Sequence, residues 1–325
     1  MSPPKILMGT GLWGDETSKE VVTKLAEVLK ELKIKEIDGA ALYPITNPGQ
    51  SEKLIGECGY VENGFLVDSK ILHFGGGEGT LSKAAIERSL DQSLANIKTD
   101  KLHILYCHGP DKETPIAEQV ATLDAEYKKG KFEKLGVCNF PIEMLEQYLK
   151  TAEEKGYIKP SVFQGQYNLL CRGYEARLLP LLRKHNISFV AYSPLAGGYL
   201  TGKLTFSTGT EDLKETRFNV SDTNYMGMAY RNWYDKPSMH SAVRKMEGLC
   251  KAHGVQMSDA ACRWVLHHSI LDGEHGDGVI IGPRTLAQLA KYAESYKQGP
   301  LTDELAKELS DVWEIVKEDA ASIVY

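Results

Sequence analysis

The chain has 325 residues, of which 42% are hydrophobic and 25% are charged, and its formal net charge is −6. This composition is typical of a folded globular protein and excludes disordered, collagen-like and coiled-coil classes. Because no basic stripe offsets the acidic balance, we expect no nucleic-acid partner.

Neither a membrane-spanning segment nor an export signal is predicted. No apolar run approaches the roughly 18 residues of a membrane-spanning helix, so we expect no membrane partner. The opening residues are not followed by the apolar segment of a secretory signal. The six cysteines lack Cys-x-x-Cys spacing, which is typical of reduced thiols rather than of disulfides or a zinc site. We therefore expect a cytoplasmic protein without a bound metal.

Short β-branched or aliphatic runs, which predict strands, alternate with longer segments of helical periodicity. The predicted strands are Lys5–Met8, Glu36–Ala40, Phe65–Ser69, Leu102–Cys107, Phe132–Val137, Val162–Gln164, Ser188–Ala191 and Val279–Ile281. Residues 17–33 begin with a capping-box pattern at Thr17 and carry one apolar face, as do residues 82–97. Thr114, followed by proline, predicts the N-cap of another helix. This alternation predicts βαβ units and a parallel sheet.

The spacing of the strands favours a particular α/β fold. Strand ends recur about every 26 to 37 residues, close to one strand-plus-helix unit. Eight such units fit a closed (β/α)8 barrel (a TIM barrel) better than an open doubly wound sheet. No linker divides the chain, so we expect one domain over residues 1–325. The pattern breaks after strand seven, where residues 200–237 predict a long, helix-poor loop: a lid over the barrel mouth or, alternatively, a surface insertion.

Four polar residues stand at or beyond predicted strand ends, where the active sites of such barrels lie: Asp38, Tyr43, Lys70 and His108. Each alone has an ordinary explanation, such as a turn cap, a packed ring or a solvated side chain. Together they form an acid–base group, because a lysine ammonium draws the pKa of a nearby phenol from about 10 toward neutrality. A carboxylate keeps that lysine protonated, and a histidine polarises a carbonyl oxygen. The set suits carbonyl reduction with a proton from Tyr43.

Further motifs follow along the chain. They are Asp38-Gly-Ala-Ala-Leu-Tyr43, Ser51-Glu52-Lys-Leu-Ile-Gly56, His108-Gly-Pro-Asp111, Gly136-Val-Cys-Asn139-Phe, Gln164-Gly-Gln-Tyr-Asn168, Tyr192-Ser-Pro-Leu-Ala-Gly-Gly-Tyr-Leu-Thr-Gly-Lys203 and Ile281-Gly-Pro-Arg284-Thr-Leu-Ala-Gln288. With these motifs, essentially the whole chain resembles the aldo-keto reductases. The segments Gly130-Lys-Phe-Glu-Lys-Leu-Gly136 and Arg217-Phe218 make it most similar to the aflatoxin-aldehyde and succinic-semialdehyde reductase branch.

This resemblance implies roles for individual residues. It implies that the four polar residues above are a catalytic tetrad and that a nicotinamide cofactor supplies hydride. The implied cofactor residues are Asn139 and Gln164 at the carboxamide, Tyr192 stacked on the nicotinamide, Ser193, Leu195, Gly197 and Lys203 at the pyrophosphate, and Gly282, Arg284, Thr285 and Gln288 at the adenosine end. The glycine-rich stretch 75–79 lacks Rossmann spacing and is interpreted as a flexible loop.

The segment after strand eight bears on the choice of cofactor. Thr285-x-x-Gln288 is a capping box, and a helix N-terminus at this place in a barrel often binds phosphate. Arg284 adds a bidentate donor suited to a 2′-phosphate, so we expect NADPH rather than NADH. Tyr292 departs from the asparagine that the family often has at its position.

We expect Trp13, Tyr43, His108 and Arg231 at the substrate. Arg231 is a candidate for binding a carboxylate or the cofactor phosphates, with a solvated side chain as the alternative. Members of the branch commonly carry a further arginine near the C-terminus, and the last four residues, 322–325, contain none. This difference favours a neutral aldehyde, a dicarbonyl or pyridoxal over a carboxylated substrate.

Two hypotheses for the function therefore stand side by side. The first is NADPH-dependent reduction of an aldehyde or ketone to the alcohol. The alternative is a cofactor-binding regulatory or redox-sensing subunit with little turnover. Separately, Cys107 and Cys138 stand at predicted strand ends and are candidates for sensing oxidants, with the packing of buried thiols as the ordinary explanation. The sequence leaves a homo-oligomer open.

Overall fold

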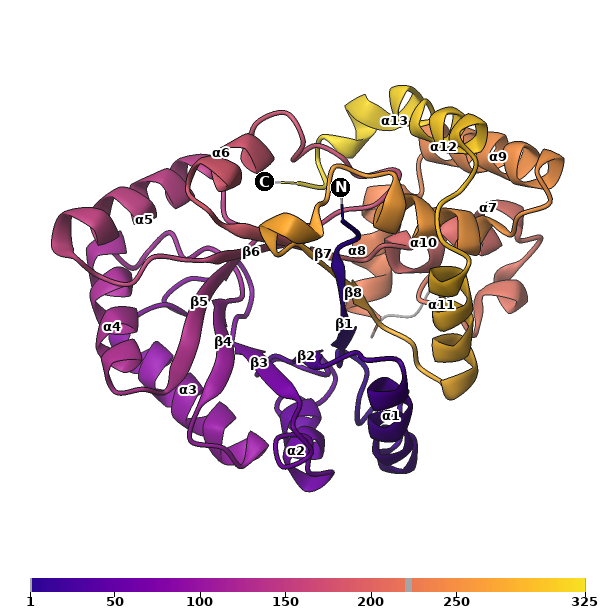
Figure 1. Ribbon diagram of the computed structural model, residues 1–325. Helices are drawn as coiled ribbons and strands as arrows, with labels where there is room; N and C mark the ends of the chain where they lie inside the picture. Colours follow the sequence, from indigo (N-terminus) through magenta and orange to yellow (C-terminus); the bar gives the residue numbers. More distant parts are fainter. Residues whose placement is uncertain (1, 220–223, 325) are drawn as a thin grey trace.

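Eight parallel strands close into a barrel in the computed structural model, which describes residues 2–219 and 224–324 (Figure 1). They follow chain order around the barrel, and the first strand pairs with the eighth. The strands are β1 (Lys5–Gly9), β2 (Glu36–Asp38), β3 (Leu66–Lys70), β4 (Leu102–Cys107), β5 (Phe132–Cys138), β6 (Val162–Gln166), β7 (Ser188–Tyr192) and β8 (Gly278–Ile281). The predicted (β/α)8 barrel is confirmed, with strand ends that shift by only a few residues.

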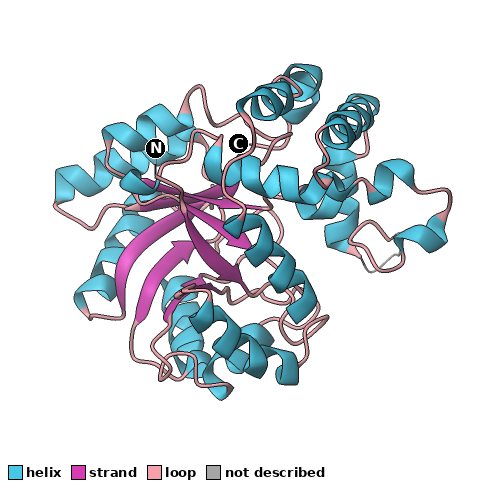
Figure 2. Cartoon of the chain, turned by 45° about the vertical axis from the view of Figure 1, so that its right-hand side comes forward, coloured by secondary structure: helices cyan, strands magenta, loops and turns pink. Residues whose placement is uncertain are grey.

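Helices surround the central strands (Figure 2). They are α1 (Lys19–Glu31), α2 (Gln50–Glu57), α3 (Lys83–Ile97), α4 (Ile116–Lys128), α5 (Ile142–Lys155), α6 (Leu178–Lys184), α7 (Lys203–Phe206), α8 (Tyr225–Tyr234), α9 (Pro237–Ala252), α10 (Met257–His267), α11 (Leu286–Lys297), α12 (Asp303–Ser310) and α13 (Trp313–Ala320), with short 3-10 helices η1 (Ala196–Thr201), η2 (Thr210–Leu213) and η3 (Gly273–His275). The helices α12 and α13 pack on α9 beside the barrel.

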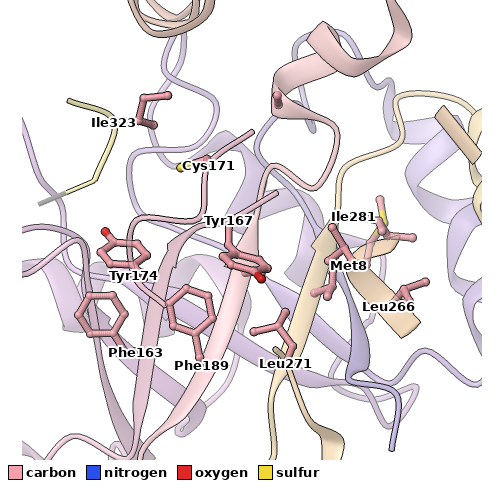
Figure 3. Packing of buried hydrophobic residues seen from close by; sticks show 14 of the residues in the cluster. Met8, Phe163, Tyr167, Cys171, Tyr174, Phe189, Leu266, Leu271, Ile281 and Ile323 are labelled. Carbon is pink, nitrogen blue, oxygen red and sulfur yellow. The ribbon is translucent and has the colours of Figure 1, made fainter. Parts of the chain in front are cut away.

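The apolar core has two parts. A small cluster that includes Leu7, Tyr106 and Val190 is drawn from β1 and from β4 to β8. The larger cluster includes the residues between strands and helices, where Phe163 and Phe189 stack with ring centroids 6.0 Å apart (Figure 3). A barrel with both regions filled is a packed scaffold, so polar groups with functional geometry are concentrated at the strand ends.

Gly136 illustrates how tightly the barrel is packed. It pairs with Tyr106 across β4 and β5, and a Cβ built on it would lie 2.2 Å from the Tyr106 ring. Only glycine leaves room for that ring at this point.

Two predicted helix starts are wrong, because the threonine hydroxyls donate hydrogen bonds to other residues and do not cap the helices. The cap of α1 is Ser18, whose Oγ accepts from the Val21 N–H at 3.4 Å, while the buried Thr17 donates to the Arg284 carbonyl. Thr114 donates to Asp111 at 2.6 Å, and α4 begins two residues later.

The predicted helix-poor loop at 200–237 is also wrong in its secondary structure. The segment contains α7, η2 and α8, while residues 220–223 lie outside the described part of the chain. Asn224 caps α8 by accepting from the Gly227 N–H at 2.9 Å, and Tyr234 stacks on Tyr199 at 5.4 Å. The helix is therefore stabilised by packing on η1, a contact that periodicity alone does not reveal.

Candidate active site

The four polar residues predicted at the strand ends converge at the carboxyl ends of β2, β3 and β4. Asp38 and Lys70 end their strands, Tyr43 lies in the loop after β2, and His108 directly follows β4. Lys70 Nζ donates to Asp38 Oδ1 at 2.7 Å and to the Gly39 carbonyl at 2.8 Å. The Lys70 ammonium lies 5.1 Å from the Tyr43 ring centroid, and the Tyr43 and His108 rings meet edge to face at 5.5 Å.

The Lys70–Asp38 pair is an ion pair in the interior. Both side chains are buried, with exposed fractions of 0% and 4%. Burial alone would lower the pKa of Lys70, but the negative charge of Asp38 and the hydrogen bond that Asp38 accepts help to outweigh it, so that pKa is raised. Lys70 is therefore held as a cation beside the phenol.

The pKa of the Tyr43 phenol differs from the sequence prediction. Burial raises the pKa of the Tyr43 phenol to about 12, even though Lys70 acts in the opposite direction. The expected fall toward neutrality is wrong for this structure, because loss of hydration outweighs a cation that Asp38 already neutralises. Tyr43 is consequently a fully protonated phenol at neutral pH.

His108 is held as a neutral imidazole. Burial is the largest cause, and Lys70 and His73 add to it in keeping the pKa of His108 well below its usual range. Its Nδ1 is buried without a hydrogen-bond partner among the described residues. A neutral imidazole with a free ring nitrogen can donate one N–H to a carbonyl oxygen.

The three residues implied at the carboxamide and nicotinamide lie in, or directly after, neighbouring strands. Gln164 Nε2 donates to Asp38 Oδ1 at 2.8 Å, so the Asp38 carboxylate oxygen accepts from an amide and an ammonium. The Tyr192 hydroxyl donates to Asn139 Oδ1 at 3.0 Å. Asn139 has a positive φ of 57°, a conformation that asparagine tolerates better than most residues. These contacts join the ends of β5, β6 and β7 to the tetrad.

A cavity of about 450 Å³ lies between the segments after β1, β7 and β8. Its lining contains seven of the predicted cofactor residues: Ser193, Leu195, Gly197, Lys203, Gly282, Arg284 and Gln288. Lys291 also lines it and was missed from the sequence, although it stands one helical turn beyond Gln288. With Lys203, Arg217 and Arg284, the cavity carries four basic side chains against Glu16 and Glu215.

The start of α11 matches the predicted capping box. Thr285 is the N-cap, and its Oγ1 accepts from the Gln288 N–H at 3.2 Å. Gln288 Oε1 in turn accepts from the Arg284 N–H at 2.7 Å. Thr285 is not part of the cavity lining and acts here on the helix.

The structure does not support substrate contacts for Trp13 and Arg231. Trp13 is 1% exposed and packs on Tyr60 with ring centroids 5.1 Å apart. Arg231 donates twice to the Phe218 carbonyl, at 2.9 and 2.8 Å, and once to Asp235 at 2.7 Å. Trp13 is enclosed by core contacts, and the Arg231 guanidinium already has hydrogen-bond acceptors within the protein.

Cys107 and Cys138 lie beside the tetrad as buried thiols. Burial raises the pKa of Cys107 to about 12 and that of Cys138 well above its usual range. Since the thiolate is the reactive form, these environments favour the packing role over oxidant sensing.

On the amino-terminal side of the tetrad, Glu36, Asp68 and His103 form the one group in the described chain with metal-ligand spacing. Lys134 Nζ lies 3.3 Å from His103 Nε2, and His103 Nδ1 lies 2.9 Å from Asp68 Oδ1. Glu36 pairs with Lys5. The lysines already supply positive charge here, so the group forms a hydrogen-bonded network.

No helix in the described segments is long and apolar enough to cross a membrane.

Sequence comparison assigns the chain to a family. Residues 5–314 match the Aldo/keto reductase family. An oxidoreductase of Leptosphaeria maculans is 34% identical and covers 98% of this chain and 96% of its own. An aldo-keto reductase of Pseudocercospora fijiensis is 32% identical, covering 88% and 95%. Aflatoxin B1 aldehyde reductase member 2 of Rattus norvegicus is 30% identical, covering 96% and 85%, which confirms the predicted branch. The chain belongs to the aldo/keto reductase family of oxidoreductases.

Proposed function

We propose that this protein reduces an aldehyde or ketone to the alcohol with NADPH, and that Tyr43 donates the proton. The observation that carries the proposal is the buried Lys70–Asp38 pair beside a protonated phenol and a neutral imidazole. The four groups provide an acid, a charge that stabilises its conjugate base, and a hydrogen-bond donor within one site.

The cavity residues fit a phosphate-bearing dinucleotide. Four basic side chains face a space of about 450 Å³, and a Cβ at Gly282 would meet no atom within 4 Å. Ser193, Leu195, Gly197 and Lys203 would hold the pyrophosphate, Gly282, Arg284 and Gln288 would serve the adenosine end, and Thr285 would act there only through its cap of α11. Asn139 and Gln164 would bind the carboxamide beside the Tyr192 ring. When bound, the reduced nicotinamide supplies hydride to the carbonyl carbon.

The residues of this chain would then stabilise and protonate the carbonyl oxygen. His108 donates a hydrogen bond to the carbonyl oxygen and stabilises the charge that develops there. The Tyr43 hydroxyl transfers its proton to that oxygen, and the phenolate left behind faces the Lys70 ammonium. Asp38 keeps Lys70 protonated and in place, so the charge on Tyr43 is compensated inside the barrel.

The experiment is Tyr43→Phe, which removes only the phenolic oxygen. General-acid groups contribute about a hundredfold or more, so we expect kcat/KM for aldehyde reduction to fall by at least about a hundredfold. The Kd of NADPH, measured by fluorescence titration, is expected to stay within about twofold.

Tyr148→Phe is the matched control, because Tyr148 is also buried and its hydroxyl has no partner among the described residues. Equal losses of binding and turnover in Tyr43→Phe would contradict the proton-donor role. A wild-type protein that binds NADPH and reduces no aldehyde would instead support the regulatory-subunit alternative.

We further propose an uncharged substrate. The Arg231 guanidinium, the expected carboxylate partner, already donates to the Phe218 carbonyl and to Asp235. Benzaldehyde and 4-carboxybenzaldehyde form a matched pair for the test, and the neutral compound is expected to have the higher kcat/KM. A preference for the carboxylated compound would contradict this proposal.

A further inference from the structure

An ion pair joins two of the segments that line the cavity. The carboxylate of Glu16, in the loop after β1, accepts from Arg284 Nη1, in the turn after β8. Arg284 Nη2 donates to the Glu215 carbonyl at 2.9 Å, from the segment after β7. All three residues line the cavity, so one guanidinium joins three loops there.

The backbone places Glu16 and Arg284 together. Thr17, next to Glu16, is completely buried and donates to the Arg284 carbonyl at 3.3 Å. On the other side, the Arg284 N–H is held by Gln288 at 2.7 Å. The pairing therefore follows from two anchored loops and is more than a chance contact of long side chains.

The chemistry of this pair bears directly on a phosphate. A guanidinium binds carboxylates and phosphates with the same donors, so Glu16 occupies a donor of Arg284 that a phosphate would use. A phosphate dianion placed there would also be repelled by the Glu16 carboxylate. A carboxylate at such a position is, in contrast, a good acceptor for a ribose 2′-hydroxyl, the group that distinguishes NADH.

We propose that Glu16 is a cofactor-specificity residue: it competes with a 2′-phosphate for Arg284 and accepts a hydrogen bond from a 2′-hydroxyl. Glu16 thereby reduces the difference in affinity between NADPH and NADH, so that NADH binds as well. The inference rests on the proposed function, since it concerns the same cofactor cavity.

The test is the pair of dissociation constants for NADPH and NADH, measured by quenching of tryptophan fluorescence, with no substrate present. In Glu16→Gln the competing charge is removed from a partly exposed site, so we expect NADPH to bind about fivefold to tenfold more tightly. NADH is expected to bind equally or more weakly. Glu16→Ala removes the acceptor as well and should weaken NADH further.

Glu20→Gln is the matched control, since Glu20 is four residues away, bonds Lys24 and is exposed. It removes the same charge and should leave both constants unchanged. If the ratio of the NADPH and NADH dissociation constants is the same in Glu16→Gln as in the wild type, the inference is overturned.

Two further outcomes separate this inference from the proposed function. If wild-type protein binds neither dinucleotide, the proposed function itself is wrong and the inference fails with it. If Arg284→Ala weakens NADPH selectively while Glu16→Gln changes nothing, the cofactor assignment stands and only the role of Glu16 fails.

Discussion

At the scale of single residues, burial controls the acid–base groups as strongly as their neighbours do. The pKa of Tyr43 rises to about 12 despite the nearby Lys70, while the pKa of Lys70 rises because Asp38 outweighs its desolvation. Tyr43 therefore starts as a neutral acid. The cation beside it acts on the phenolate formed during proton transfer.

Asp38→Asn tests this arrangement, because it leaves Lys70 buried without its counter-charge. Burial then dominates and lowers the pKa of Lys70, so kcat/KM should decline as pH rises through that lower pKa, where the wild-type profile stays flat. At neutral pH we expect a loss of about tenfold or more.

Stability provides a second readout for the same variant. An uncompensated buried charge costs about 3–5 kcal/mol, so urea denaturation should show a loss of this order. The double variant Asp38→Asn/Lys70→Met removes both charges and should recover much of that stability without recovering activity. Unchanged pH profiles in Asp38→Asn would contradict the assigned role of Asp38.

At the scale of elements, the start of α11 combines structural and functional roles. Thr285 caps the helix, and Gln288 holds the Arg284 backbone at the edge of the cavity. The helix has twelve residues, and its first turn, which includes the cavity-lining Gln288, lies at the positive end of the helix dipole. Loss of the Thr285 cap should therefore weaken cofactor binding by disturbing the helix start, although Thr285 itself does not contact the cofactor.

Thr285→Ala is expected to lower the free energy of unfolding by about 0.5–2 kcal/mol and to raise the Kd of NADPH severalfold. Ser18→Ala is the control, because Ser18 caps α1 in the same way and does not line the cavity. It should lower stability by a similar amount and leave the Kd unchanged. Equal Kd values in both variants would show that the α11 cap is purely structural.

At the scale of the whole molecule, the barrel interior contains charged groups that must be compensated. On the amino-terminal side of the tetrad, Lys134, His103 and Asp68 form one chain of hydrogen bonds. Burial, followed by the charges of Glu36 and Asp38, raises the pKa of Asp68 well above its usual value. Asp68 therefore opposes folding when it is ionised.

This raised pKa gives the barrel an unusual pH dependence. Above 3.8 the folded protein holds the Asp68 proton more tightly than the unfolded chain does, so this group lowers stability as pH rises toward its folded pKa. In Asp68→Asn that loss is absent. The stability of the variant relative to wild type should therefore increase with pH from about 4 upward, as measured by urea denaturation.

In Asp111→Asn, the stability relative to wild type is expected to change with pH in the opposite direction. Burial acts upward on the pKa of Asp111, but hydrogen bonds from Thr114, Leu81 and Glu113 outweigh it and lower that pKa. Asp111 therefore stabilises the fold above 3.8, and this contribution is lost as pH falls. If both variants show the same pH trend, the assigned role of Asp68 in the network is wrong.

The sequence was sufficient for the strands, their barrel closure and the four polar residues at strand ends. Period-2 and period-3.6 patterns reflect local backbone geometry, and parallel strands connected by helices leave few topologies. The sequence did not predict α8, whose Tyr234 packs on Tyr199 of η1. It also gave the wrong N-caps, because the Thr17 and Thr114 hydroxyls donate to Arg284 and Asp111.

The sequence by itself therefore determined the barrel, the family and the identity of the candidate acid–base residues, because these depend on local spacing and motif order. Only the tertiary structure decided that Tyr43 is a buried, protonated phenol and that Glu16 reaches Arg284. These properties depend on burial and on contacts between segments far apart in the chain, and neither is contained in the spacing of residues along it.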